Sequence, residues 1–214
     1  TGHTGFIGSW LTNILLNFGA KITGYSKSIP QKKCLFNSTN LENKIDHIIG
    51  NVCEYKKIKS VVIKKKPQII FHLAAQSLVY DSFVRTRETY LTNLIGSANL
   101  LEILKEYNGA SALIFFTSDK CYENKEKKKS FIETDRLGGK DPYSASKACQ
   151  EILFWSYKNS FFKNLPAATV RFGNVFGGGD FAKNRIIPDL IKSIQKKKMI
   201  LRQPNSIRPW QFVL

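Results

Sequence analysis

Two side chains near the middle of the chain have the types and the spacing for proton transfer. Tyr143 and Lys147 are four residues apart in the run PYSASK, which places them on one face of a helix. An ammonium group near a phenol favours the phenolate and lowers the pKa of the phenol. A phenolate can remove a proton from a sugar or alcohol hydroxyl while hydride leaves the carbon. Because this spacing is common in helices, the assignment needs support from Ser118, which ends the apolar run ALIFFTS.

A glycine-rich turn near the start of the chain suits a phosphate group. Gly2, Gly5 and Gly8 follow a G-x-x-G-x-x-G spacing, and the helix that follows would point its N-terminal amides at an anion. A dinucleotide site normally has an acidic residue about 20 residues further on, which holds the ribose hydroxyls. Here Ser26 and Lys27 stand at that distance: the serine can bond a hydroxyl and the lysine favours a 2'-phosphate. The residues therefore leave the choice between NAD and NADP open.

The apolar pattern predicts the elements that would position these groups. We expect helices over residues 6–18, 55–65, 88–107 and 141–157, and strands over residues 21–25, 45–49, 68–75, 112–118 and 167–175. Residues 26–44 are polar and are expected to form a loop. This alternation predicts an α/β fold with a doubly wound parallel sheet, whose ligands bind at the carboxyl ends of the strands. We expect a nucleotide-binding domain over residues 1–174 and the start of a smaller lobe over residues 175–214.

The composition bears on partners and on the cellular compartment. The net charge is +17, but the lysines fall in short scattered clusters at 64–66, 127–129 and 196–198, which favours a solvated surface over nucleic-acid binding. A basic binding protein on the same fold, with steep salt dependence, is the competing class. The four cysteines form no C-x-x-C pair, so we expect free thiols in a reducing cytoplasm and no metal site. No apolar run reaches about 18 residues, so we expect no membrane span.

Six segments together resemble the extended short-chain dehydrogenase/reductase superfamily and, within it, the nucleotide-sugar 4,6-dehydratases. The segments are TGHTGFIGSWL, FHLAAQSLV, TSDKCYENKE, LGGKDPYSASKACQE, RFGNVFGGGD and IRPWQFVL. They run from the first residue to the last, and TSDKCYENKE with RPWQ is more specific than the superfamily pattern. The resemblance implies a Rossmann-type fold, NAD as the cofactor and CDP-glucose as the substrate, with the nucleotide inferred from the resemblance alone.

The resemblance also implies an internal oxidation, elimination and reduction. Tyr143 would take the proton from the hydroxyl on sugar carbon 4 while hydride passes to NAD. Water would leave across carbons 5 and 6, with Asp119 protonating the departing hydroxyl, and the hydride would return to carbon 6. Lys120 stands where many of these enzymes carry a glutamate base; its role, as a base or as a stabiliser of the enolate, stays open. The product would be a 4-keto-6-deoxy sugar nucleotide for a surface polysaccharide. A sugar-nucleotide epimerase or reductase is the alternative.

The remaining site residues are carried over from the family's motifs. The expected catalytic residues are Ser118, Asp119, Lys120, Tyr143 and Lys147. The expected cofactor-binding residues are Gly2, Thr4, Gly5, Phe6, Ile7, Gly8, Ser26, Asn51, Val52, Leu73, Ala74, Ala75, Asn93, Thr117, Tyr143 and Lys147. The expected substrate-binding residues are Gln76, Ser77, Asn174 and Arg208. The three histidines show no partner spacing and receive no catalytic role.

The resemblance further predicts that this chain is a fragment. In the family a central strand immediately precedes the position of Thr1, and the chain continues beyond that of Leu214 into the substrate lobe. Without that strand, its two neighbours should have unpaired edges. We therefore expect the isolated chain to be inactive or poorly folded. We expect the full-length protein to form a homodimer through the helices that bear Asn93 and Tyr143.

Overall fold

The computed structural model describes every residue except 125–129, 197–200, 202–203 and 214. Lys127 to Lys129, one of the three lysine clusters, therefore lie outside the described residues. Helices and strands alternate along the chain, as the apolar pattern predicts. The first part contains α1 (Phe6–Asn17), β1 (Thr23–Ser26), α2 (Leu35–Ser38), the 3-10 turn η1 (Leu41–Asn43), β2 (Asp46–Ile49) and α3 (Tyr55–Lys65).

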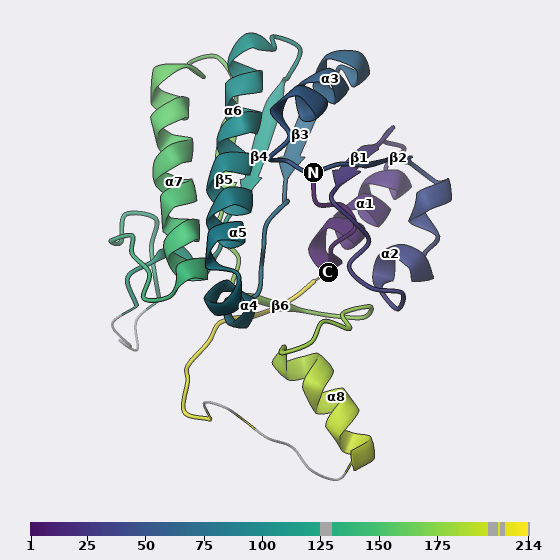
Figure 1. Cartoon of the computed structure of the whole chain (residues 1–214), viewed down its shortest axis with the longest axis vertical. Coiled ribbons are helices and arrows are strands. Elements are labelled where there is room, and N and C mark those ends of the chain that lie inside the picture. Colours follow the sequence, from purple (N-terminus) through teal and green to yellow (C-terminus); the bar gives the residue numbers. More distant parts are fainter. Residues whose placement is uncertain (125–129, 197–200, 202–203, 214) are drawn as a thin grey trace.

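The central part follows the same alternation, and a smaller part comes after it. The central elements are β3 (Ile69–His72), α4 (Val79–Val84), α5 (Thr86–Tyr90), the π-turn η2 (Leu91–Ile95), α6 (Gly96–Glu106), β4 (Ala112–Phe116), the 3-10 turn η3 (Asp119–Cys121), α7 (Pro142–Ser160) and β5 (Ala167–Val170). The last elements are β6 (Asn174–Phe176), α8 (Ile186–Lys196) and β7 (Trp210–Phe212). Figure 1 shows α8 projecting away from the other helices.

All strand pairs in the described part of the chain are parallel, which confirms the predicted sheet type. β1 pairs with β2, β4 lies between β3 and β5, and β6 pairs with β7. The first two residues connect the first two of these sheets: the Gly2 amide donates to the Tyr25 carbonyl at 2.9 Å, and the Leu73 amide donates to the Thr1 carbonyl at 3.1 Å. β1 and β3 thus face each other across the start of the chain, each paired with one strand among those described.

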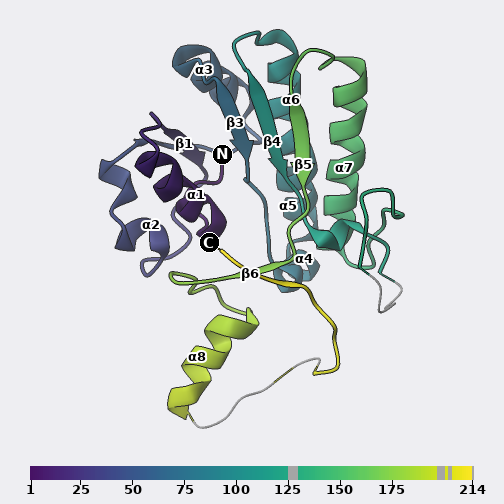
Figure 2. The ribbon, with the colours of Figure 1, turned by 180° about the vertical axis from the view of Figure 1, so that it is seen from behind.

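The main core lies between the β3–β4–β5 sheet and the helices that cover it. Helices α3, α5, α6 and α7 lie in front of this sheet in Figure 1, and the strands face the viewer from behind in Figure 2. Leu100 and Leu101 of α6, Leu113 and Phe115 of β4, and Phe154 of α7 are almost completely buried there. Burial of each such side chain contributes about 1.5–3 kcal/mol, so this layer holds the ends of β3, β4 and β5 in place.

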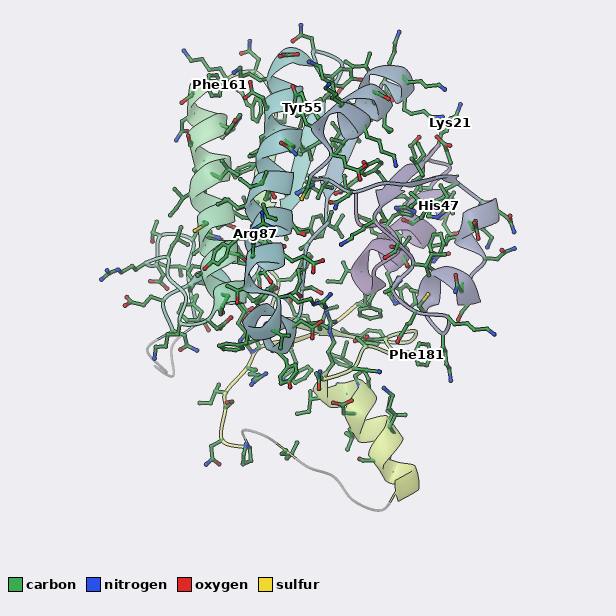
Figure 3. The ribbon with its side chains drawn as sticks, in the orientation of Figure 1. Lys21, His47, Tyr55, Arg87, Phe161 and Phe181 are labelled. Carbon is green, nitrogen blue, oxygen red and sulfur yellow. The ribbon has the colours of Figure 1, made fainter. Side chains whose placement is uncertain are left out.

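A second, smaller core explains why part of the expected loop 26–44 is ordered. Phe36 of α2 is fully buried, and its ring contacts the His47 ring with their centroids 5.0 Å apart. His47 also bonds His3 at 2.7 Å between ring nitrogens, and Figure 3 places it among α1, α2 and β2. Burial lowers the pKa of His3 to about 3, so this imidazole is neutral. The histidines therefore have structural contacts here.

Two predicted elements are interrupted, each for a local reason. The helix expected over 88–107 widens into a π-turn at Leu91–Ile95, where the Asn93 amide reaches the backbone of Gln76. Such turns occur frequently at functional sites. The strand expected over 167–175 breaks after Val170, because β6 pairs with β7 and the Asn174 amide donates to the Pro209 carbonyl at 3.0 Å. Helices α4 and α8 lie outside the predicted helix ranges.

Within the described residues, none of the helices combines the length and the apolar composition needed to cross a bilayer. No three His, Cys, Asp or Glu side chains of these residues gather closely enough to hold a metal ion.

Candidate functional site

The glycine turn packs tightly against the end of β3. Gly2 has φ +76°, and a Cβ at that position would lie 2.6 Å from the Ala74 nitrogen. A Cβ at Gly8 would lie 2.3 Å from the Gly2 carbonyl oxygen, which is closer than any side chain tolerates. Gly5 precedes the first residue of α1, whose N-terminal amides lack partners within the helix. The turn therefore presents a helix N-terminus with the chemistry for an anion.

A cavity of about 980 Å³ opens over this turn and extends to the ends of β4 and β6. It is lined by almost every residue expected to bind the cofactor, namely Gly2, Thr4, Gly5, Phe6, Ile7, Gly8, Ser26, Asn51, Val52, Leu73, Ala74, Ala75, Thr117, Tyr143 and Lys147. It is also lined by the expected substrate and remaining catalytic residues, namely Gln76, Ser77, Asn174, Arg208, Ser118, Asp119 and Lys120. Residues as far apart in the sequence as Gly2 and Arg208 thus line one cavity.

Asn93 is the expected site residue that does not line this cavity. It is fully buried, and its side-chain oxygen accepts a hydrogen bond from the backbone amide of Gln76 at 2.8 Å. Its amide nitrogen donates to the Gln76 carbonyl and to the Ser146 hydroxyl, at 3.1 and 2.8 Å. All these bonds are made within the protein, so Asn93 fixes the wall rather than facing the hollow. The direct cofactor contact expected of Asn93 stays a prediction.

Gln76 faces the cavity, but its side-chain amide is largely used by the protein. Its nitrogen donates to the Leu78 carbonyl and to the Thr89 hydroxyl, both at 3.0 Å. Its oxygen accepts from the Leu78 amide at 2.6 Å. These bonds hold the turn between β3 and α4. Together with Asn93, they give the small residues Ala74 and Ala75 a fixed backbone at the cavity wall.

The start of α7 places Tyr143 and Lys147 at the cavity. Asp141 caps the helix, since its carboxylate accepts from the Ser144 amide at 2.9 Å, and Pro142 occupies the first turn. Tyr143 and Lys147 are both buried, and the Lys147 ammonium donates to the Phe116 carbonyl at 3.3 Å. The Ser118 hydroxyl lies close enough to the Tyr143 phenol to act on its pKa. The structure therefore brings serine, tyrosine and lysine together, as the sequence predicts.

The environment of Tyr143 raises the pKa of its phenol, whereas the sequence predicts a lowered pKa. Burial raises the pKa of Tyr143 to about 12, against smaller lowering effects of the Ser118 hydroxyl and the Arg185 charge. Burial also lowers the pKa of Lys147 to about 8, which Cys121 and Glu151 partly counteract. The prediction that Lys147 gives Tyr143 a lowered pKa is thus wrong for the unliganded cavity. Here desolvation of the buried phenol is the largest effect on its pKa.

Asp119 and Lys120 follow Ser118 in the short turn η3. The Asp119 amide donates to the Phe172 carbonyl at 2.9 Å, which ties this turn to the end of β5. The Ser118 hydroxyl donates to the Asp119 carboxylate at 3.0 Å and accepts from the Lys120 amide at 3.2 Å. Both side chains are half-buried and line the cavity. A carboxylate and an ammonium therefore stand beside the buried tyrosine.

A buried ion pair behind the cavity was not predicted from the sequence. Glu151 is fully buried, and its carboxylate accepts from Arg171 at 2.6 Å and from the Thr169 hydroxyl at 3.0 Å. The Thr117 hydroxyl donates to the same carboxylate. Because Glu151 lies one helical turn after Lys147, the i, i+4 spacing in SASKACQE could have identified it. The pair joins α7 to the ends of β4 and β5, next to Ser118.

The part of the chain after Val175 adds residues that sequence reasoning also missed. Asp180 and Arg185 line the cavity and pair at 3.4 Å, and the charge of Arg185 acts on the Tyr143 phenol. Arg208 is exposed at the cavity rim, and the Asn174 side-chain amide donates to the Pro209 carbonyl at 3.2 Å. Arg185 and Arg208, both from this part of the chain, thus line the cavity.

Comparison with known proteins identifies the family to which the chain belongs. The sequence pattern of the NAD dependent epimerase/dehydratase family matches residues 1–214. The chain is 43% identical to CDP-glucose 4,6-dehydratase of Salmonella typhimurium, over the whole chain and 62% of that protein. It is 30% identical to dTDP-D-glucose 4,6-dehydratase of Dictyostelium discoideum, over 92% of the chain and 48% of that protein. The chain therefore spans about half to two thirds of these relatives.

Solved structures share the fold. The dTDP-glucose 4,6-dehydratase of Bacillus anthracis, solved in complex with NAD, matches with a TM-score of 0.83 at 24% identity, over 99% of this chain and 66% of that one. The UDP-N-acetylglucosamine 4-epimerase of Methanobrevibacter ruminantium matches with a TM-score of 0.84 at 26% identity, over 99% of this chain and 67% of that one. These matches confirm the predicted α/β Rossmann-type class. By its sequence pattern and its fold, the chain belongs to the NAD dependent epimerase/dehydratase family.

Proposed function

We propose that this chain is the catalytic part of a nucleotide-sugar 4,6-dehydratase that uses NAD and acts on CDP-glucose. The observation that carries the proposal is the single cavity shared by the glycine turn and by Ser118, Tyr143 and Lys147. Its volume of about 980 Å³ has room for extended ligands, which suits a dinucleotide beside a sugar nucleotide. The 43% identity to a CDP-glucose 4,6-dehydratase supports the substrate.

The residues present fit a dinucleotide. The N-terminus of α1 favours a pyrophosphate, and the close packing at Gly2 and Gly8 brings backbone rather than side chains to that end. Ser26 lies where a ribose would be held, and Asn51 and Val52 line the wall beyond it. When bound, the nicotinamide ring supplies a hydride acceptor with a positive charge. We assign residues 1–174 to this nucleotide-binding domain and residues 175–214 to the start of a substrate lobe.

Tyr143 is assigned as the base for the sugar hydroxyl at carbon 4. Its phenol must lose its proton, and the Ser118 hydroxyl and the Arg185 charge both favour the phenolate. A cationic ligand beside the ring would act in the same direction. Lys147, held at the Phe116 carbonyl, fixes the end of β4 against α7 and adds positive charge when protonated. Ser118 orients the phenol toward the substrate.

Asp119 and Lys120 are assigned to the loss of water. A hydroxyl that leaves sugar carbon 6 needs a proton, and Asp119 is the acid closest in sequence to the tyrosine's serine partner. Lys120, which also lines the cavity, is assigned to the proton on carbon 5 or to the enolate formed there. An epimerase or reductase at carbon 4 needs no such acid. Asp119 therefore distinguishes the proposed reaction from that alternative.

We also propose a homodimer and a cytoplasmic location for the full-length protein. Large apolar side chains lie exposed on neighbouring elements, namely Ile95 on η2 and Ile152 and Trp155 on α7. Exposed apolar groups on one helical surface favour association with a second copy. All four cysteines are free, which suits a reducing compartment.

The proposed function is tested with the full-length protein, NAD and CDP-glucose. We expect NMR to detect a 4-keto-6-deoxy sugar product, and we expect Tyr143→Phe to abolish its formation. The matched control Tyr55→Phe removes a phenol hydroxyl from α3, which contributes no residue to the cavity lining, and should leave turnover unchanged. Absence of product with the unmodified protein, or full activity of Tyr143→Phe, would contradict the assignment.

A further inference from the structure

The end of β1 lacks the acidic residue that dinucleotide sites usually place there. Ser26 and Lys27 stand about 20 residues after the glycine turn, where an acid would hold the ribose hydroxyls of NAD. The Ser26 hydroxyl accepts from the Thr4 amide at 3.4 Å and bonds His3 at 3.0 Å. An unpaired Lys27 at this place would attract the 2'-phosphate of NADP.

Lys27 is paired, and its partner comes from a distant element. Its ammonium donates to the Glu88 carboxylate at 2.9 Å, although 61 residues separate the two. Both residues line the cavity, at the end that also contains Ser26 and Asn51. Glu88 lies on α5, so the pair connects β1 to the helix layer across this end of the hollow. Arg85 lies 3.6 Å from the second oxygen of Glu88 and helps to keep the carboxylate ionised.

We propose that Glu88, through its ion pair with Lys27, supplies the carboxylate that the end of β1 lacks and makes the cavity select NAD over NADP. This inference rests on the proposed dinucleotide site. The selection has two parts. Lys27 must leave Glu88 before it can bind a 2'-phosphate, and Glu88 repels that phosphate, which carries a charge of about −1.5 to −2. The ribose hydroxyls of NAD can instead donate hydrogen bonds to the Glu88 carboxylate.

The expected change in NADP affinity depends on how exposed the ion pair of Lys27 and Glu88 is. The side chains of Lys27 and Glu88 are 62% and 38% exposed, so solvent screens their charges strongly. Removing the negative charge should therefore change the affinity for NADP by roughly tenfold at low salt, rather than by several orders of magnitude. The change should become smaller as the salt concentration rises, because the groups are exposed.

The test measures the dissociation constants of NAD and NADP by calorimetry for the full-length protein and three variants. Glu88→Gln should tighten NADP binding roughly tenfold and weaken NAD binding, because Lys27 is released and the ribose loses its carboxylate. Lys27→Met combined with Glu88→Gln should lose most of the gain for NADP. The control Glu106→Gln removes the same charge from an exposed pair with Lys59 at 2.6 Å, away from the cavity, and should change neither constant.

Each outcome bears on a separate claim. An unchanged ratio of NAD to NADP affinity in Glu88→Gln would overturn the inference while leaving the dinucleotide site intact. An equal gain with and without Lys27 would show that Glu88 acts alone and would overturn the paired mechanism. If the unmodified protein bound neither nucleotide, the proposed function itself would fail and the inference with it. Preferred binding of NADP by the unmodified protein would also contradict the selection proposed here.

Discussion

The buried pair of Glu151 and Arg171 predicts a large loss of stability when one partner is neutralised. Glu151→Gln keeps the side-chain volume but leaves Arg171, which is 11% exposed, without its counter-charge. The Arg171 Nε has no hydrogen-bond partner among the described residues, and the other hydrogen bonds of this guanidinium, to the Tyr122 hydroxyl and the Glu133 carbonyl, are made to neutral groups. Breaking one side of a buried pair costs about 3–5 kcal/mol. We therefore expect the free energy of unfolding of Glu151→Gln to fall by about 3 kcal/mol or more.

The assay is urea unfolding of the full-length protein, followed by circular dichroism. The double variant Glu151→Leu with Arg171→Met should recover much of the loss, since an apolar replacement of both partners is often neutral. Glu106→Gln, in an exposed pair with Lys59, should leave the urea midpoint close to that of the unmodified protein. A loss below about 1 kcal/mol in Glu151→Gln, or no recovery in the double variant, would refute this reasoning.

Three further predictions concern the site. Asp119→Asn should abolish the loss of water while leaving some NADH formation, measured by product NMR and nicotinamide absorbance; unchanged dehydration would exclude Asp119 as the acid. The folded-state pKa of Lys147, about 8, lies below its unfolded value of 10.5, so the unfolded chain binds more protons between these values and stability rises with pH. Relative to Lys147→Met, the unmodified protein should therefore gain up to about 3 kcal/mol of unfolding free energy from about pH 7 to pH 10.5, and parallel pH profiles would contradict the lowered pKa. Gly8→Ala should abolish NAD binding in calorimetry, because its Cβ would lie 2.3 Å from the Gly2 oxygen, and unchanged affinity would contradict the tight turn.

The class of the fold could be predicted from the sequence because it depends on local periodicity. The strands around Ile70 and Leu113 form apolar runs, and the glycine turn and Pro142 mark where helices begin. What the sequence did not reveal depends on contacts between distant segments. The π-turn at Asn93 exists because its amide bonds the turn at Gln76, which no helical pattern encodes.

The candidate site shows the same difference between features set by local sequence patterns and features set by contacts between distant segments. Ser118, Tyr143 and Lys147 were found because motif spacing places them on known elements. Glu88 could not be identified as the partner of Lys27, because the two lie 61 residues apart in the sequence and meet only at the cavity of the folded chain. The pKa of Tyr143 was predicted in the wrong direction, since burial of the phenol cannot be read from the spacing of tyrosine and lysine.

The measurement that tests the central claim most directly follows one hydrogen atom through the reaction. The full-length protein would be incubated with catalytic NAD and CDP-glucose that carries deuterium on sugar carbon 4, and the product would be analysed by NMR and mass spectrometry. If a single cavity performs oxidation, elimination and reduction, the deuterium should appear on carbon 6 of the 4-keto-6-deoxy product. Deuterium that is lost to solvent, or that stays on carbon 4, would contradict the account.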